Sequence, residues 1–341
     1  MSRAAACLLG AALLVAFTGT TASAAPHVDR VSTAADGTQG DKASSAAVTT
    51  PNGRFVAFRS SATNLVPEGI THPGTYSYIR DLRTGEVTKM ENALSTPRLS
   101  ADGRWATYID WGSRHVNVFL TDLTNGTRTR VGGNAQDSAG SPEISANGRY
   151  IAYQWSGHPQ FPTRIDLYDR VTGTTETVSA GPADSGRDMG NPSLSGDGRL
   201  VAYQDNGTGD VWIADRATGR QTEVDDGTRS TVVQLSADGH VLVMDSADGS
   251  YVRDLRTDRV RHFPGVQVRA VSPDGRRLLL QDGQSNLWLL HGGHRELVGN
   301  GVAVDGSVSD RGRSVVYSTE GADIVPGDTN DAYDVFQWRS R

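Results

Sequence analysis

The chain has 341 residues, a formal net charge of −6 and 21% charged residues. Its cations are almost all arginine, with Lys42 and Lys89 as the only lysines, and no basic run is present. Because nucleic-acid phosphates are usually met by clustered basic side chains, this charge pattern argues against a nucleic-acid partner.

The first predicted element is an amino-terminal leader. Arg3 precedes an apolar run from Ala4 to Phe17, and small residues up to Ala24 offer a cleavage site for a signal peptidase. The run would rise about 21 Å as a helix, short of the ~30 Å hydrocarbon core, so no permanent membrane span is expected. The only cysteine, Cys7, lies inside this leader. We therefore predict a signal peptide over 1–24 and a secreted or envelope-located mature protein without disulfides.

A nine-residue pattern then occurs seven times. Each copy has a turn glycine, usually after Asp or Asn, followed by a short aliphatic and aromatic run. Asp-Gly and Asn-Gly are strong hairpin signals because both residues tolerate a positive φ, and the following run is typical of a strand. The copies are TPNGRFVAF (50–58), SADGRWATY (100–108), SANGRYIAY (145–153), SGDGRLVAY (195–203), SADGHVLVM (236–244), SPDGRRLLL (272–280) and SDRGRSVVY (309–317).

A second turn signature follows the first five copies. In the first four, an aspartate precedes a glycine by four residues, as in DLRTG at 81–85. Such an aspartate can accept N–H bonds of its turn while the glycine takes the left-handed conformation. The fifth copy keeps Asp254 but has Asp258 in place of the glycine. The first four aspartates are Asp81, Asp122, Asp169 and Asp215.

Together the two signatures predict units of four short antiparallel strands. Such units, repeating every 36 to 50 residues, are typical of a β-propeller. We therefore predict an all-β, seven-bladed β-propeller over 25–341. The last unit lacks an outer strand, and we expect 27–32 to supply it and close the ring. The blades are expected at about 46–91, 96–131, 141–179, 191–225, 231–263, 267–298 and 303–338.

The repeat resembles the TolB-type, WD40-like propeller repeat (PD40) over about residues 27–341, through S-x-D-G-R-hydrophobic-A-Y followed by D-L-x-T-G. Two longer copies, SATNLVPEG (61–69) and GADIVPGDTND (321–331), are similar to a segment of secreted bacterial members. TolB carries an α/β domain before its propeller, and prolyl oligopeptidases carry a hydrolase domain. No stretch of this sequence resembles either domain. The resemblance therefore implies the fold and a secreted form, and it names no activity.

Catalytic motifs are not evident. No G-x-S-x-G elbow of a serine hydrolase occurs, and His291 and His294 fall at an expected surface turn. The hairpin aspartates Asp102, Asp197, Asp238 and Asp274 are expected to serve their own turns. No catalytic residue is predicted. An enzyme would need acidic or basic side chains that converge at the channel mouth, with Asp110, His115, Asp184, Arg187 and Asp188 as candidates.

A calcium site is the one cofactor alternative. Asp328, Asn330 and Asp334 supply oxygens within one segment, and Ca²⁺ prefers six to eight oxygen ligands. The EF-hand pattern fails here, and Asp and Asn also favour turns. We expect no cofactor, with calcium at these residues as the alternative.

Uneven connections indicate where a ligand binds. Those at about 33–45, 60–75, 156–163 and 319–332 are long, and long connections on a rigid scaffold often carry function. Aromatic and histidine side chains on this rim can hold sugars or peptides, although they can equally cover a neighbouring sheet. The predicted ligand-binding residues are Trp111, His115, Trp155, His158 and Phe161.

These features predict a secreted, monomeric, non-enzymatic propeller that binds a protein, peptide or glycan at the rim. One alternative is a propeller enzyme of the polysaccharide lyase or glycosidase type, with an acidic or metal site at the channel mouth. The other is a structural cell-surface protein.

Overall fold

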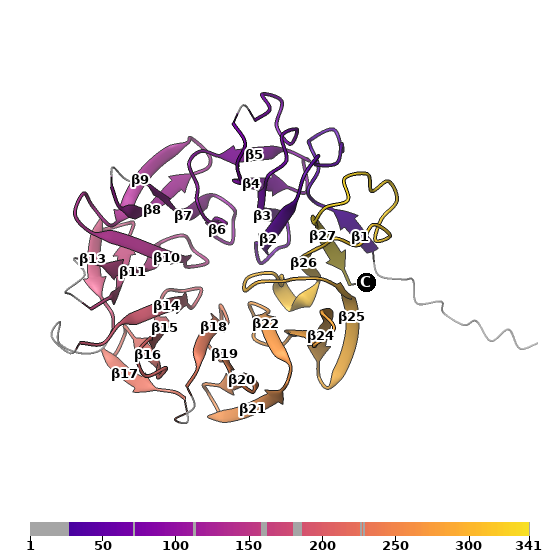
Figure 1. Ribbon diagram of the computed structural model, residues 1–341. Coiled ribbons are helices and arrows are strands. Elements are labelled where there is room, and N and C mark those ends of the chain that lie inside the picture. The colour runs from indigo at the N-terminus through magenta and orange to yellow at the C-terminus, as the bar shows by residue number, and fades with distance from the viewer. Residues whose placement is uncertain are drawn as a thin grey trace, which may run out of the picture.

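The chain forms a closed ring of seven β-sheets around a central axis (Figure 1). The computed structural model describes residues 27–70, 72–111, 114–157, 162–179, 186–225, 227 and 229–340. The predicted signal peptide lies outside the described residues, as do His158, Phe161 and Asp184. In the described part of the chain, no helix is long and apolar enough to cross a membrane. The prediction of an all-β, seven-bladed propeller is confirmed.

Six sheets each contain four antiparallel strands in chain order, from the axis outward. Blade one contains β2 (Ser44–Thr49), β3 (Phe55–Ser60), β4 (Tyr76–Asp81) and β5 (Val87–Met90), and blade two contains β6 (Arg98–Leu99), β7 (Trp105–Trp111), β8 (Val116–Asp122) and β9 (Thr127–Gly132). Blade three contains β10 (Ser138–Ile144), β11 (Tyr150–Ser156), β12 (Arg164–Asp169) and β13 (Thr174–Thr177), and blade four contains β14 (Met189–Leu194), β15 (Leu200–Asp205), β16 (Val211–Asp215) and β17 (Arg220–Glu223). Blade five contains β18 (Thr231–Leu235), β19 (Val241–Ser246), β20 (Gly249–Asp254) and β21 (Arg259–Pro264), and blade six contains β22 (Gln267–Val271), β23 (Leu278–Gln281), β24 (Asn286–His291) and β25 (His294–Asn300).

Blade seven joins the two ends of the chain. It contains β26 (Ser314–Thr319), β27 (Asp334–Arg339) and, as its outer strand, the amino-terminal β1 (His27–Arg30). β1 pairs antiparallel with β27, with His27 opposite Arg339 and Arg30 opposite Phe336. The predicted closure of the ring by the amino-terminal segment is therefore observed.

Residues 303–309, at the start of the predicted seventh blade, do not form a continuous inner strand. Only two isolated bridges connect this part of the chain to β26, at Val302–Ser318 and Val308–Val315. Between them the chain turns at Gly306, where φ is +77°, and the Ser307 N–H donates to the Val304 carbonyl. A local turn therefore replaces the ladder bonds that a continuous strand needs.

The alternating strand directions give the ring two distinct faces. We call the face with the turns between first and second strands, and between third and fourth strands, the turn face. The opposite face, called the loop face here, carries the connections between second and third strands and those between blades. The hairpin aspartates lie on the turn face and satisfy their own turns, as predicted: Asp197 accepts bonds from the Ser195 hydroxyl (2.6 Å) and the Arg199 N–H (2.9 Å).

An ion pair that the sequence analysis missed connects the two turns of each of blades one to four. In blade one, Arg54 Nε donates to Asp81 across 2.9 Å, and the guanidinium also contacts the second carboxylate oxygen. In blade three, the hydrogen bonds from Arg149 hold the pKa of Asp169 at about 2, against the opposing effect of burial. The pairs are Arg54–Asp81, Arg104–Asp122, Arg149–Asp169 and Arg199–Asp215.

Two sets of side chains pack the blades together. One recurrent set is buried between sheets and contains Phe58, Tyr108, Tyr153, Tyr203 and Tyr317. The second set is the residue that follows the hairpin arginine, which we call the wedge. In blades one to three it is aromatic, and its ring touches the turn glycine of the next blade. A Cβ added to Gly103 would lie 2.2 Å from the Phe55 ring, so only glycine fits below this wedge.

This packing predicts unequal costs for two glycine substitutions. Gly103 and Gly126 have φ values of +72° and +73°, but a Cβ at Gly126 would meet nothing within 4 Å. Gly126→Ala should therefore lower the free energy of unfolding by about 1–2 kcal/mol, the cost of the left-handed backbone alone. Gly103→Ala should cost clearly more, because the Phe55 ring must move. Urea unfolding measures both, and equal losses would contradict the wedge contact.

Candidate functional site

The inner strands surround a central cavity of about 490 Å³. All seven blades contribute to its lining, which includes Ser95 and Thr96 just before β6 and continues into the middle of the inner strands. The amino-terminal ends of the inner strands follow the blade-to-blade connections, so this cavity opens on the loop face. It lies on the face where the sequence predicted ligand binding.

Backbone irregularities concentrate at this cavity. The inner strands of blades one, three and four each shift register where a non-glycine residue has a positive φ. These residues are Ala46 (53°), Ser141 (49°) and Asn191 (48°), and all three line the cavity. Bulges re-aim side chains and are frequent beside functional sites, and a left-handed non-glycine residue is a strained conformation.

Arg98 forms the centre of a charged network in the cavity. Its Nε lies 3.0 Å from Glu143 Oε1, and its other nitrogens contact the carbonyl (2.9 Å) and the carboxylate of Asp305. The network therefore connects blade two with blades three and seven across the axis. The same three residues line a second cavity of about 120 Å³ on the turn-face side. The charged network thus lies between the two hollows.

Burial sets the protonation of this network. It raises the pKa of Glu143 above its ordinary value of 4.5, because burial and the nearby Asp305 outweigh the Arg98 cation. Burial alone would lower the pKa of Arg98, but the carboxylates of Asp305 and Glu143 raise it instead. Arg98 therefore stays charged, while Glu143 holds its proton more tightly than a free glutamate.

Asp245 and Arg269 also line the cavity, and each forms a hydrogen bond with a neighbouring side chain. Burial raises the pKa of Asp245, which accepts a hydrogen bond from the Ser250 hydroxyl. Arg269 Nε donates to Gln281 Oε1 across 2.6 Å. The sequence analysis identified none of the charged cavity residues, since Arg98, Glu143, Asp245, Arg269 and Asp305 lie on five different blades.

The predicted rim residues are only partly brought together. Trp111 ends β7 at the loop face and is 60% exposed. His115 Nδ1 lies 3.4 Å from the hydroxyl of Ser138, the first residue of β10. The next β10 residue pairs with Trp155, whose ring packs against the core under the Arg164 guanidinium, 3.7 Å from the ring centroid. Trp155 therefore serves packing as well, and Trp111 alone of these three presents a large free surface.

The enzyme candidates do not form one group among the described residues. Asp110 is paired with Arg128 in its own blade. Arg187 lies 3.7 Å from Asp205, and Asp188 accepts the Thr163 N–H at 3.0 Å. None of these candidates lines the central cavity.

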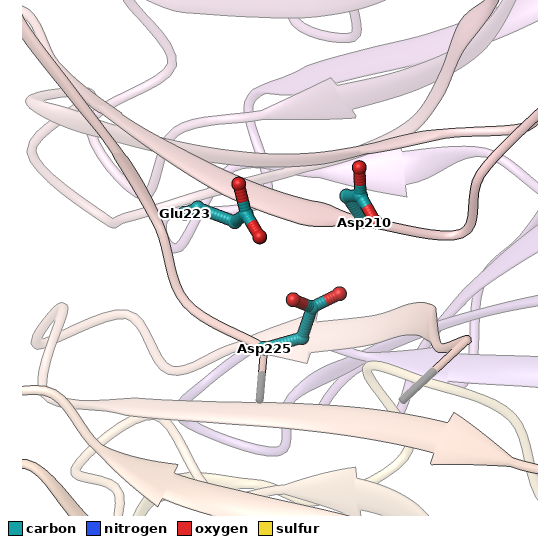
Figure 2. A group of neighbouring side chains, drawn as sticks. All are labelled: Asp210, Glu223 and Asp225. Atoms are coloured by element: carbon teal, nitrogen blue, oxygen red, sulfur yellow. The ribbon is translucent and has the colours of Figure 1, made fainter. Parts of the chain in front are cut away.

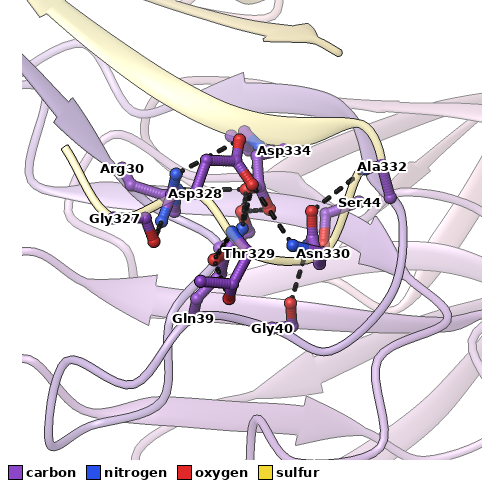
Figure 3. Close-up of polar contacts among 12 residues, drawn as sticks. Arg30, Gln39, Gly40, Ser44, Gly327, Asp328, Thr329, Asn330, Ala332 and Asp334 are labelled. Carbon is purple, nitrogen blue, oxygen red and sulfur yellow. Dashed lines mark hydrogen bonds and ion pairs between the residues drawn. The ribbon is translucent and has the colours of Figure 1, made fainter. Parts of the chain in front are cut away.

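The calcium alternative falls in a polar cluster where blade seven meets the connection after β1 (Figure 3). Asp334 Oδ2 accepts from Gln39 Nε2 (2.6 Å) and lies 3.0 Å from Arg30 Nε. Asp328 also accepts from Gln39 (2.9 Å), while the Asn330 amide donates to the Gly40 carbonyl (2.7 Å). Protein donors thus already bind the candidate oxygens, which favours a capped loop over a cation site.

A different acidic group lies at the loop-face end of blade four (Figure 2). Carboxylate oxygens of Asp210, Glu223 and Asp225 lie within 4.8 Å of one another, because β16 and β17 run antiparallel beside each other. The Asp225 carboxylate also accepts the Val211 N–H at 3.0 Å. Three carboxylates fall short of the six or more oxygens of a calcium site, so the group does not by itself define one.

Comparisons with known proteins support the fold. No family model and no curated protein matches the chain, so the resemblance to the PD40 repeat stays a prediction. Among solved structures, it is similar to an oligogalacturonate lyase in complex with manganese (15% identity, 93% of this chain and 94% of that one, TM-score 0.65). A second oligogalacturonate lyase, from Vibrio parahaemolyticus, matches at 13% identity over 92% and 93%, with a TM-score of 0.63.

A third similar structure is the propeller domain of the Trilobed protease from Pyrococcus furiosus, at 15% identity over 87% and 92% with a TM-score of 0.60. That domain is described as having an open velcro topology, whereas β1 closes the ring in this chain. At these identities the similarities establish a shared fold.

The Glu143 environment predicts a specific pH dependence. Its pKa is raised in the folded state, so the folded protein binds this proton more tightly than the unfolded chain does. Its contribution to stability should therefore decline as the pH rises from about 4.5 through the raised pKa. When the free energy of unfolding is measured with urea between about pH 4 and pH 8, it should depend less on pH for Glu143→Gln than for the unaltered protein. Arg98→Ala should steepen this dependence, and identical slopes for Glu143→Gln and the unaltered protein would contradict this account.

The polar cluster of Figure 3 predicts calcium independence. Because Arg30 and Gln39 already engage the oxygens of Asp328 and Asp334, added Ca²⁺ has to displace these donors. The melting temperature should therefore be equal in chelator and in millimolar Ca²⁺. An upward shift with Ca²⁺ would favour the cation site instead.

Proposed function

We propose that this chain is a secreted, non-enzymatic propeller that binds a protein, peptide or glycan on its loop face. The exposed Trp111 carries the proposal, because it lies on the face where the 490 Å³ cavity opens. An exposed indole offers a large rigid surface at low entropic cost, and it stacks on sugars or packs on peptide side chains.

The charges of the cavity favour binding over catalysis. Arg98 contacts both Glu143 and Asp305, so each carboxyl group is already engaged by a protein side chain. An acid–base enzyme needs two groups with distinct protonation states on either side of its substrate. In this cavity the two carboxyl groups instead contact the same guanidinium.

The similarity to oligogalacturonate lyases favours a second candidate, a propeller enzyme acting on an acidic polysaccharide. The donor set argues against a resident manganese ion in this cavity. No histidine is among the described residues that line it, and two arginines stand beside the carboxylates. Cationic side chains repel a divalent ion, and borderline metals usually recruit imidazole.

The binding proposal predicts a separation of affinity from stability. The purified chain from residue 25 is screened against immobilised glycans and peptides, and the best ligand is titrated by calorimetry. Trp111→Ala should weaken binding at least about tenfold, without lowering the melting temperature. Val171→Ala is the matched control, since Val171 is 65% exposed on the turn face and should leave affinity unchanged.

The same preparation discriminates the two candidates. Incubation with oligogalacturonate and Mn²⁺ should yield no unsaturated sugar by ultraviolet absorbance. Release of such a product, or an equal affinity for Trp111→Ala and the unaltered protein, would overturn the binding proposal.

A further inference from the structure

The turn face has a repeated seat for an aromatic ring between neighbouring blades. At three successive junctions the wedge ring touches the turn glycine of the next blade, and the hairpin arginine of its own blade lies over it. The guanidinium carbon is 4.5 to 5.0 Å from the ring centroid. The rings and glycines are Phe55 on Gly103, Trp105 on Gly148 and Tyr150 on Gly198.

The next blade often adds a second cation to this seat. Arg170 lies 4.0 Å from the Trp105 centroid, and Arg216 lies 4.3 Å from the Tyr150 centroid. A ring between blades therefore meets two guanidinium groups at these junctions. Such contacts are attractive because the face of an aromatic ring is electron-rich.

The junction between blades four and five has the same frame without the ring. Of the four blades that carry the arginine–aspartate pair, blade four alone has an aliphatic wedge, Leu200. Arg199 keeps its bonds to Asp215 at 2.9 and 2.7 Å, yet no ring lies beneath it among the described residues. A Cβ added to Gly239 would lie 3.1 Å from Leu200 Cδ1, compared with 2.2 to 2.6 Å from the three wedge rings.

The missing ring leaves a larger groove. At the junction of blades one and two, the groove beside Phe55 has a volume of about 260 Å³. At the junction of blades four and five, the corresponding groove beside Leu200 has a volume of about 470 Å³. Corresponding strand and turn positions line both grooves, so the smaller wedge side chain accounts for part of the difference.

The larger groove gains a cation at two positions, while His240 takes the place of Arg104 and Asp258 takes that of the turn glycine. Arg220 stands where the smaller groove has Glu86, and Arg256 stands where it has Thr124. Both arginines are exposed and form no ion pair with a carboxylate in the described part of the chain. The other two arginines of this groove are already paired, Arg199 with Asp215 and Arg253 with Asp258.

We propose that the groove between blades four and five binds a peptide segment of a partner protein that carries an aromatic side chain flanked by acidic residues. The ring occupies the space beside Leu200 and lies against the Arg199 guanidinium, as Tyr150 lies against Arg149. The acidic flanks pair with Arg220 and Arg256. This groove is on the turn face and shares no residue with the central cavity, so it is independent of the loop-face function.

The test uses the peptide Asp-Asp-Tyr-Asp-Asp with a fluorescent label, titrated against the full mature chain. A counterpart with Ala for Tyr measures the contribution of the ring. Leu200→Tyr fills the seat from within, and Arg220→Ala with Arg256→Ala removes the two free cations. Each change should weaken binding at least about tenfold, and added salt should weaken it further.

Controls separate this groove from other surfaces. Glu86→Ala with Thr124→Ala alters the corresponding groove between blades one and two, and Trp111→Ala alters the loop face. Both should leave the peptide affinity unchanged. If Leu200→Tyr fails to fold, the variant with Arg220→Ala and Arg256→Ala still tests the proposal, because both arginines are exposed. No saturable binding to the unaltered protein, equal binding of the peptide without Tyr, or unchanged affinity of the arginine variant would overturn the proposal.

Discussion

The pairing of β1 with β27 is the constraint on which the rest of the molecule depends. Without it, β27 exposes a row of unpaired N–H and C=O groups, and the first and last blades have no covalent link. Cys7 is the single cysteine of the sequence, so no disulfide within the chain can take over this role. Instead Asp334, completely buried in blade seven, accepts the Ser32 hydroxyl and meets the Arg30 guanidinium. Backbone ladder and buried polar contacts together hold the ring shut.

Closure of the ring also creates the central cavity. Arg98 comes from blade two and Asp305 from blade seven, two residues that approach only when the ends of the chain are joined. Glu143 completes the network from the next blade. The charged centre and the loop face around it are thus properties of the ring as a whole, whereas each groove between blades depends on two neighbouring sheets.

The sequence predicted what depends on local chemistry. The turn aspartates, the turn glycines and the closing strand all follow from short patterns and from counting strands. The arginine–aspartate pairs were missed, although the sequence contains a signal for them. In blade five His240 replaces the hairpin arginine and Asp258 replaces the turn glycine, so the two turns change together. The Arg98 network leaves no such signal, since it depends on the register of bulged inner strands. Trp155 shows the converse, because a side chain predicted to bind ligands also packs in the core.

Closure at the outermost strand also governs how the molecule reaches its native state. The contact between Asp29 and Arg339 spans 310 positions, nearly the length of the chain. A contact between positions so far apart forms slowly, because the loop-closure entropy must be overcome before it can form. β1 is synthesised long before β27 and therefore waits for it, and until then blade seven has an open edge available to a neighbouring molecule.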